Sequence, residues 1–104
     1  MARILILEPH LDVRNLLAHV VRSAGHEPVL ETTDGDPDAV VVEPASPPLR
    51  AAARRLVEKR PGTPVVCVSI GPPSASSSAL APAVHLIKPF SLGELKQALA
   101  VALG

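Results

Sequence analysis

Two carboxylates, a hydroxyl and an ammonium each stand directly after a short apolar run of this sequence. They are Glu8, Glu43, Ser69 and Lys88, which follow the runs at residues 3–7, 39–42, 64–68 and 84–87. The first three runs are typical of strands buried on both faces of a parallel sheet, and residues 84–87 predict the last strand. Because open α/β sheets bind ligands beyond the carboxyl ends of their strands, we expect the four side chains to converge. Such a set could hold a cation between its carboxylates, or an anion against its ammonium and hydroxyl.

The segments between these runs predict helices. The first helix carries apolar residues at spacings of three and four and ends at Gly25, a residue suited to a left-handed C-cap. Its stripe is Val13, Leu16, Leu17, Val20, Val21 and Ala24. The second begins after Ser46, with Pro47 at its first position, and stops at Pro61–Gly62. Its stripe is Leu49, Ala52, Ala53, Leu56 and Val57.

A third helix begins with Ser91 and Glu94, which match a capping box, and Phe90 is placed to pack onto Leu95. The inner stripe of this helix is expected at Leu92, Leu95, Leu99 and Leu103, with Ala98, Ala100, Val101 and Ala102 adding exposed apolar surface. The Ser-, Pro- and Ala-rich stretch at 71–82 carries no stripe and predicts a ragged helix or a loop.

A weaker strand is expected from Glu27 to Thr32. Pro28 cannot donate to a strand ladder, so this strand should lie at an edge of the sheet. The residues Asp34-Gly35-Asp36-Pro37 are typical of a turn. Too few residues separate Thr33 from Asp38 for a helix, so one crossover must be extended or a single turn.

Strands and helices thus alternate, which predicts right-handed crossovers and a parallel sheet covered on both faces, a doubly wound α/β fold. The 104 residues fit one domain, 1–104, and 47% of them are hydrophobic with a single aromatic, so the core must be aliphatic. Cys67 is the only cysteine, which excludes a disulfide framework, and it should be a buried, inert thiol.

Charge and hydropathy exclude several functions. Ten basic and ten acidic residues balance, which argues against direct nucleic-acid binding. No apolar run approaches the roughly 18 residues of a membrane span. The N-terminal segment lacks a signal-peptide pattern, so a cytoplasmic location is expected. The abundance of Ala, Arg, Pro, Gly and Val suggests a bacterium with GC-rich DNA.

Two longer motifs make a resemblance specific. They are Leu56-Val57-Glu58-Lys59-Arg60-Pro61-Gly62-Thr63-Pro64-Val65-Val66 and His85-Leu86-Ile87-Lys88-Pro89-Phe90. With them, the chain resembles the receiver domain of bacterial response regulators over nearly its whole length. The resemblance implies a flavodoxin-like, five-stranded parallel sheet in the order 2-1-3-4-5. The second helix of that family would be reduced or absent here.

The resemblance also assigns the strand ends. The family phosphorylates an Asp after its third strand, using a divalent ion held by that Asp and an acidic pair after the first strand. Ser69 and Lys88 match the phosphoryl-binding hydroxyl and lysine, and Glu8 matches the first acid. Pro9 stands where the direct metal ligand belongs, and Glu43 replaces the phosphoacceptor.

These departures imply a degenerate site. Proline offers no side-chain oxygen to Mg²⁺, which demands near-octahedral coordination, so Mg²⁺ binding should be lost or weak. Glu43 carries its carboxylate about one methylene further out than Asp, away from the in-line geometry of phosphoryl transfer. We therefore expect no enzyme and no cofactor. The chain would be a phosphorylation-independent pseudo-receiver that binds a protein partner or a second copy through residues 84–104.

Several alternatives stay open. Glu43 either mimics a phosphorylated Asp or forms a plain ion pair with Lys88, and Ser69 either keeps a role or bonds local backbone. His85, at the position of the family's switch aromatic, is a pH sensor or an ordinary half-exposed histidine. His10 could replace the ligand lost at Pro9. A rival function is a phosphorelay acceptor using Glu8, Glu43 and Lys88, and a third is an anion pocket at Ser69 and Lys88.

One helix face is basic and admits two interpretations. Its residues are Arg50, Arg54, Arg55, Lys59 and Arg60, interrupted by Glu58. The face either binds an acidic partner or nucleic acid, or is simply solvated.

Overall fold

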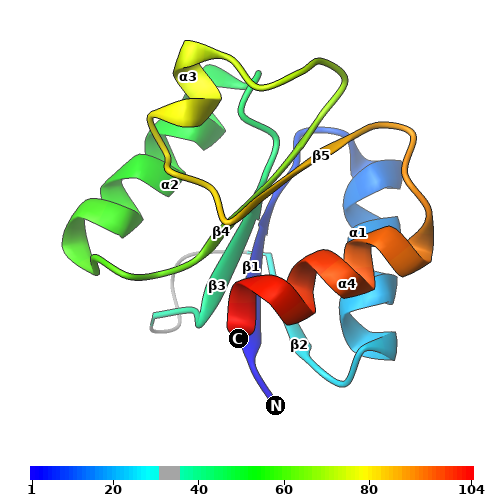
Figure 1. Cartoon of the computed structure of the whole chain (residues 1–104). Coiled ribbons are helices and arrows are strands. Elements are labelled where there is room, and N and C mark those ends of the chain that lie inside the picture. Colours follow the sequence, from blue (N-terminus) through cyan, green and yellow to red (C-terminus); the bar gives the residue numbers. More distant parts are fainter. Residues whose placement is uncertain (31–35) are drawn as a thin grey trace.

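Strands and helices alternate along the chain in the computed structural model, which describes residues 1–30 and 36–104 (Figure 1). The strands are β1 (Arg3–Leu7), β2 (Glu27–Val29), β3 (Ala39–Val42), β4 (Val65–Ser69) and β5 (Val84–Ile87). The helices are α1 (Leu11–Ser23), α2 (Pro47–Lys59), α3 (Ala75–Ser78) and α4 (Leu92–Leu103). No helix of the described residues is long and apolar enough to cross a membrane.

The strands form one parallel sheet in the order β2-β1-β3-β4-β5, which confirms the predicted topology. In its register, Leu7 lies opposite Val42, and Ser69 lies opposite Ile87. The strands therefore end nearly level with one another. Whatever follows β1, β3, β4 and β5 is brought to the same edge of the sheet.

The sheet is covered on both faces, as the unbroken aliphatic runs predicted. Ile4 and Ile6 of β1 pack toward α1 and α4, while Leu5 and Leu7 pack toward α2. β3 divides in the same way, and all four of its residues are buried. Each such side chain contributes on the order of 1.5–3 kcal/mol by leaving water. The sheet is thereby a rigid platform for the residues at its ends.

Both chain ends lie beside the amino ends of the strands (Figure 1). Met1 and Ala2 line one hollow together with Ala102 and Leu103. The two termini are therefore neighbours, at the end of the sheet away from Glu8, Glu43 and Lys88.

Two apolar stripes differ from the prediction. Leu16 of α1 is 46% exposed and Leu92 of α4 is 47% exposed, whereas Ala98 is buried and is not part of the exposed apolar surface. In α4 the buried arc runs through Leu95, Ala98 and Leu99, with Ala102 partly buried. At about 100° per residue, Leu92 falls at the margin of this arc, in the first turn, where the helix has only begun to approach the sheet.

The weaker segments are shorter than expected. β2 ends at Val29, so Leu30 already lies outside the strand, and residues 31–32 of the predicted strand lie outside the described residues. β2 is an edge strand, as Pro28 indicated. The stretch 71–82 forms a single turn, α3. Leu30 and residues 36–38 are not helical, in agreement with a reduced second helix. Asp34 and Gly35 of the predicted turn, like the rest of 31–35, lie outside the described residues.

The predicted helix ends are largely confirmed. Gly25 has φ of +86°, the left-handed conformation that its C-cap position needs. Ser91 and Glu94 form the reciprocal hydrogen bonds of a capping box. Ser46 does precede α2, with Pro47 at its first position, but the Ser46 side chain makes no capping hydrogen bond.

Candidate functional site

Backbone hydrogen bonds fix the residues that follow the strands. The Glu43 amide donates to the Leu7 carbonyl at 2.9 Å, which ties the end of β3 to the end of β1. The Lys88 amide donates to the Ser69 carbonyl at 2.7 Å and ties β5 to β4 in the same way. The convergence expected from the sequence is therefore a property of the sheet itself.

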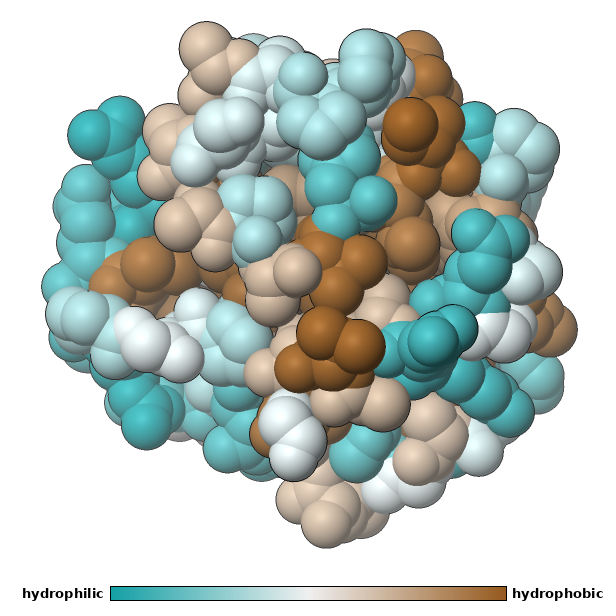
Figure 2. Space-filling view, in the orientation of Figure 1, coloured by the Kyte–Doolittle hydropathy of each residue, from teal (hydrophilic) through white to brown (hydrophobic). Residues whose placement is uncertain are grey.

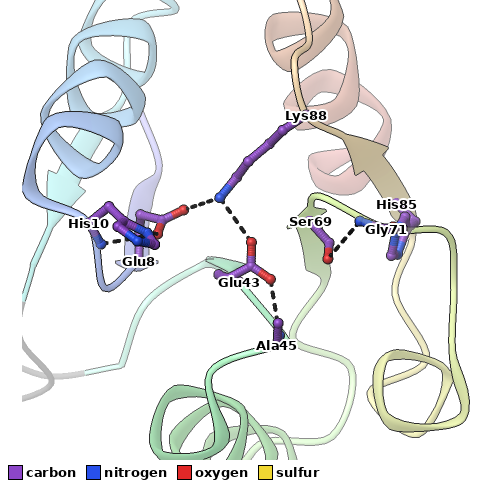
Figure 3. Close-up of polar contacts among 8 residues, drawn as sticks. All are labelled: Glu8, His10, Glu43, Ala45, Ser69, Gly71, His85 and Lys88. Atoms are coloured by element: carbon purple, nitrogen blue, oxygen red, sulfur yellow. Dashed lines mark hydrogen bonds and ion pairs between the residues drawn. The ribbon is translucent and has the colours of Figure 1, made fainter.

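Lys88 lies between the two carboxylates (Figure 3). Its Nζ donates to Glu8 Oε1 at 2.6 Å and to Glu43 Oε2 at 2.9 Å. Because β4 separates β5 from β3, the lysine side chain reaches across the end of β4 to make these contacts. Glu8, Glu43 and Lys88 thus form one ion-pair cluster, which we call the carboxylate–lysine cluster.

The other carboxylate oxygens are also hydrogen-bonded. Glu8 Oε2 accepts from the His10 amide at 3.2 Å and lies 3.3 Å from His10 Nδ1. Glu43 Oε1 accepts from the Ala45 amide at 3.0 Å. His10, proposed as a replacement ligand, therefore serves as a partner of Glu8 with a ring that is largely exposed.

The cluster is shielded from water. The side chains of Glu8, Glu43 and Lys88 are 0%, 6% and 17% exposed. Burial by itself lowers the pKa of Lys88, but its hydrogen bonds to Glu8 and Glu43 and their negative charges outweigh burial and raise that pKa above its usual value. The lysine is thus held firmly in its charged form.

Cys67 lies mid-strand in β4, and the thiol is buried, as expected. Burial, and secondarily the charge of Glu43, raises its pKa to about 11. The thiol therefore stays protonated near neutral pH, which makes it a poor nucleophile and metal ligand.

Ser69 and His85 belong to a second set of contacts, centred on Gly71 (Figure 3). The Gly71 amide donates to Ser69 Oγ at 3.4 Å, and its carbonyl lies 3.0 Å from His85 Nε2. A carbonyl only accepts, so Nε2 carries the proton. The hydroxyl of Ser69 thus turns to local backbone rather than to Lys88. Sequence reasoning missed Gly71, although its place two residues beyond Ser69 suits an ST-turn.

The carboxylates that could hold a metal ion are already bound by an internal cation. The Lys88 ammonium occupies the position between the two carboxylates. Pro9 is exposed and has no side-chain oxygen that could bind a metal ion. In residues 1–30 and 36–104, no group of three His, Cys, Asp or Glu side chains is arranged to hold a metal ion.

The basic face of α2 is partly neutralised. Arg54 pairs with Glu58 at 3.1 Å, and Arg60 pairs with Asp36 at 3.5 Å, all four at exposed positions. Lys59 lies 4.0 Å from the same Asp36. Exposed pairs of this kind contribute little stability, but they reduce the surplus charge that nucleic-acid binding would require.

Comparison with known proteins finds similar structures but no similar sequence family. Neither models of protein families nor curated proteins match the sequence. Among solved structures, the chemotaxis protein CheY4 of Vibrio cholerae superposes with a TM-score of 0.86 at 17% identity, over 99% of each chain. A response regulator receiver domain protein from Clostridium thermocellum gives 0.79 at 18% identity, covering 99% of this chain and 94% of the other. This chain has the receiver fold.

The receiver fold also occurs inside a longer similar protein. NtrX of Brucella abortus superposes with a TM-score of 0.84 at 24% identity, over 98% of this chain but only 26% of NtrX. The present chain therefore spans about a quarter of that relative. These similarities, all below 25% identity, show that the fold is shared.

Removing Lys88 alone should lower the free energy of unfolding far more than removing all three charges of the cluster. Lys88→Met leaves two carboxylates buried together, so we expect a loss of about 3–5 kcal/mol in the free energy of unfolding at pH 7. The triple variant Glu8→Gln, Glu43→Gln, Lys88→Met should recover most of this loss. Urea denaturation followed by circular dichroism measures both, and a triple variant as unstable as Lys88→Met alone would contradict a charge-based role.

The raised pKa of Lys88 gives stability with a defined pH dependence. This contribution is fully present below the usual lysine value of 10.5 and is lost as pH rises through the raised pKa of the folded state. The raised pKa of Cys67 also makes stability fall as pH rises. The comparison is therefore best made in a Cys67→Ala background. We expect the free energy of unfolding to fall between about pH 10 and 12, and to fall less when Lys88→Met is added. Equal slopes in the two proteins would refute the assignment.

Proposed function

We propose that this chain is a pseudo-receiver, a signalling module of the bacterial cytoplasm that works by protein interaction, without phosphorylation, Mg²⁺ or catalysis. The observation that carries the proposal is the Lys88 ammonium bound to both Glu8 and Glu43. In the receiver domains that the chain resembles, the equivalent carboxylates hold a divalent ion, and the lysine binds the phosphoryl group. Here the lysine and the carboxylates satisfy each other.

Charge balance supports the proposal. A divalent ion between Glu8 and Glu43 would meet a fixed positive charge less than 3 Å from each carboxylate. Incoming phosphoryl groups are negative and would face two buried carboxylates with no metal to bridge them. We interpret Glu43 as an ion-pair partner of Lys88 that holds the site in one arrangement, rather than as an acceptor.

The partner surface we propose is the face formed by β5 and α4. Figure 2 shows apolar side chains gathered on this side of the molecule. Val84 and Leu86 of β5 and Ala98 and Val101 of α4 line a groove of about 280 Å³, with Glu94 and Gln97 also on its walls. Val101 is 59% exposed. An apolar groove with a polar rim is suited to another protein chain, and a second copy of this chain is the simplest partner to test.

Mg²⁺ should leave the wild-type protein unchanged. Amide NMR spectra recorded with millimolar Mg²⁺, and then with beryllofluoride as a phosphoryl mimic, should show no shifts at Glu8, Glu43, Ser69 or Lys88. The variant Pro9→Asp, Glu43→Asp restores the family's acidic set and serves as the positive control, so its signals should shift with Mg²⁺. Wild-type shifts that spread to His85 and α4 would instead favour the phosphorelay acceptor.

Charging the β5–α4 groove should abolish association. Val101→Glu places a carboxylate in the apolar groove, while Ala100→Glu makes the same change at an exposed neighbour that does not line it. We expect light-scattering mass at increasing concentration to show a dimer for wild type and Ala100→Glu, and a monomer for Val101→Glu. A mass that is identical in all three proteins would count against this surface as a dimer interface.

A further inference from the structure

A polar cleft separates α2 from α3, beside the carboxylate–lysine cluster but distinct from it. It consists of two hollows of about 160 and 360 Å³, and both are lined by Arg50 of α2 and Ser76 of α3. Lys88 lines neither hollow. Arg50 and Ser76 are thus the two residues that the hollows share.

The two hollows differ in chemistry. The smaller one is polar, and its walls include the hydroxyls of Ser69 and Ser74 as well as Arg50 and Ser76. The larger one is lined by the apolar side chains of Ala51, Ala79 and Leu80, with a second arginine, Arg54. A ligand that spans both would therefore have a hydrogen-bonding end and a less polar end.

Arg50 is held in place without an acidic partner. Its Nη1 donates to the Pro44 carbonyl at 2.9 Å, which uses one of five N–H donors. Within residues 1–30 and 36–104, no carboxylate lies within 4 Å of this guanidinium. Glu43, which precedes Pro44, is instead neutralised by Lys88. Arg50 thus keeps a full positive charge and several unused donors at a partly buried position.

The wall of the cleft that lies opposite α2, formed by α3 and its flanking residues, carries no acidic or basic side chain. Residues 71–83 contain no Asp, Glu, Lys or Arg, so the electrostatic character of the cleft comes from α2. Of the two arginines that line the cleft, Arg54 is exposed and pairs with Glu58, which leaves Arg50 as the main positive charge. The cleft therefore favours an anion.

We propose that this cleft binds a small phosphate monoester. The phosphate would lie where Arg50 and Ser76 meet, and the organic part would occupy the larger hollow against Ala51, Ala79 and Leu80. A carboxylate has only two oxygens, both in one plane, so when both face the guanidinium fork neither is aimed at the opposite wall. A phosphate keeps a further oxygen for the serine hydroxyls, which matches the donors present. This inference does not depend on the pseudo-receiver proposal.

An amide NMR titration of the full chain tests the proposal, using phenyl phosphate and inorganic phosphate at constant ionic strength. The amides of Gly71, Ser74, Ser76 and Ala79 should shift together and saturate in the millimolar range. Phenyl phosphate should bind about tenfold more tightly than inorganic phosphate, because its ring enters the larger hollow. Absence of saturable shifts would overturn the site, and equal affinities would overturn the ester.

Two variants separate a built site from general charge attraction. Arg50→Gln should weaken phenyl phosphate binding by about tenfold or more, because it removes the charged donor. Arg55→Gln makes the same charge change at an exposed position of α2 that lines neither hollow, and it should leave the affinity unchanged. Equal weakening in both would overturn the proposal. Ser76→Ala removes the serine hydroxyl and keeps Arg50. Its affinity for phenyl phosphate therefore tests the site even if Arg50→Gln fails to fold.

Discussion

The ammonium of Lys88 between the carboxylates of Glu8 and Glu43 is the contact on which the carboxyl edge of the sheet depends. Glu8 and Glu43 follow neighbouring strands and are almost fully buried, so their negative charges would repel each other in a poorly solvated place. A single cation within hydrogen-bonding distance of both turns this repulsion into attraction. The three strands that carry these residues must therefore keep their order and register for the edge to be stable.

An internal cation differs from a bound metal ion in what it requires. A metal ion is recruited from solution and needs a vacant coordination shell, whereas Lys88 is attached to the chain and arrives with the folding of β5. The contacts of Ser69 and His85 with Gly71 are likewise internal. Under the proposed function, these two sets of contacts together describe a receiver whose site is complete without any added component.

Much of this arrangement follows from local sequence. The aliphatic runs predict buried strands because they are too short for helices and are rich in β-branched residues, and the residues at their ends must then converge. The sequence does not predict that Lys88 pairs with both Glu8 and Glu43, because the reach of its side chain across the end of β4 depends on the exact stagger of four strands. Exposure of Leu16 and Leu92 depends on where each helix meets the sheet. The cleft at Arg50 and Ser76 carries no motif, since its walls come from helices that are separate in sequence.

The closeness of the two chain ends has a practical consequence for how this fold can be combined with other sequences. Met1 and Ala2 line the same hollow as Ala102 and Leu103, at the opposite end of the strands from the carboxylate–lysine cluster. A segment joined to either end, or a host loop joined to both, would emerge from one small area. The domain could thus be inserted into another protein, or carry a label, with its cluster and its α2–α3 cleft facing away from the junction.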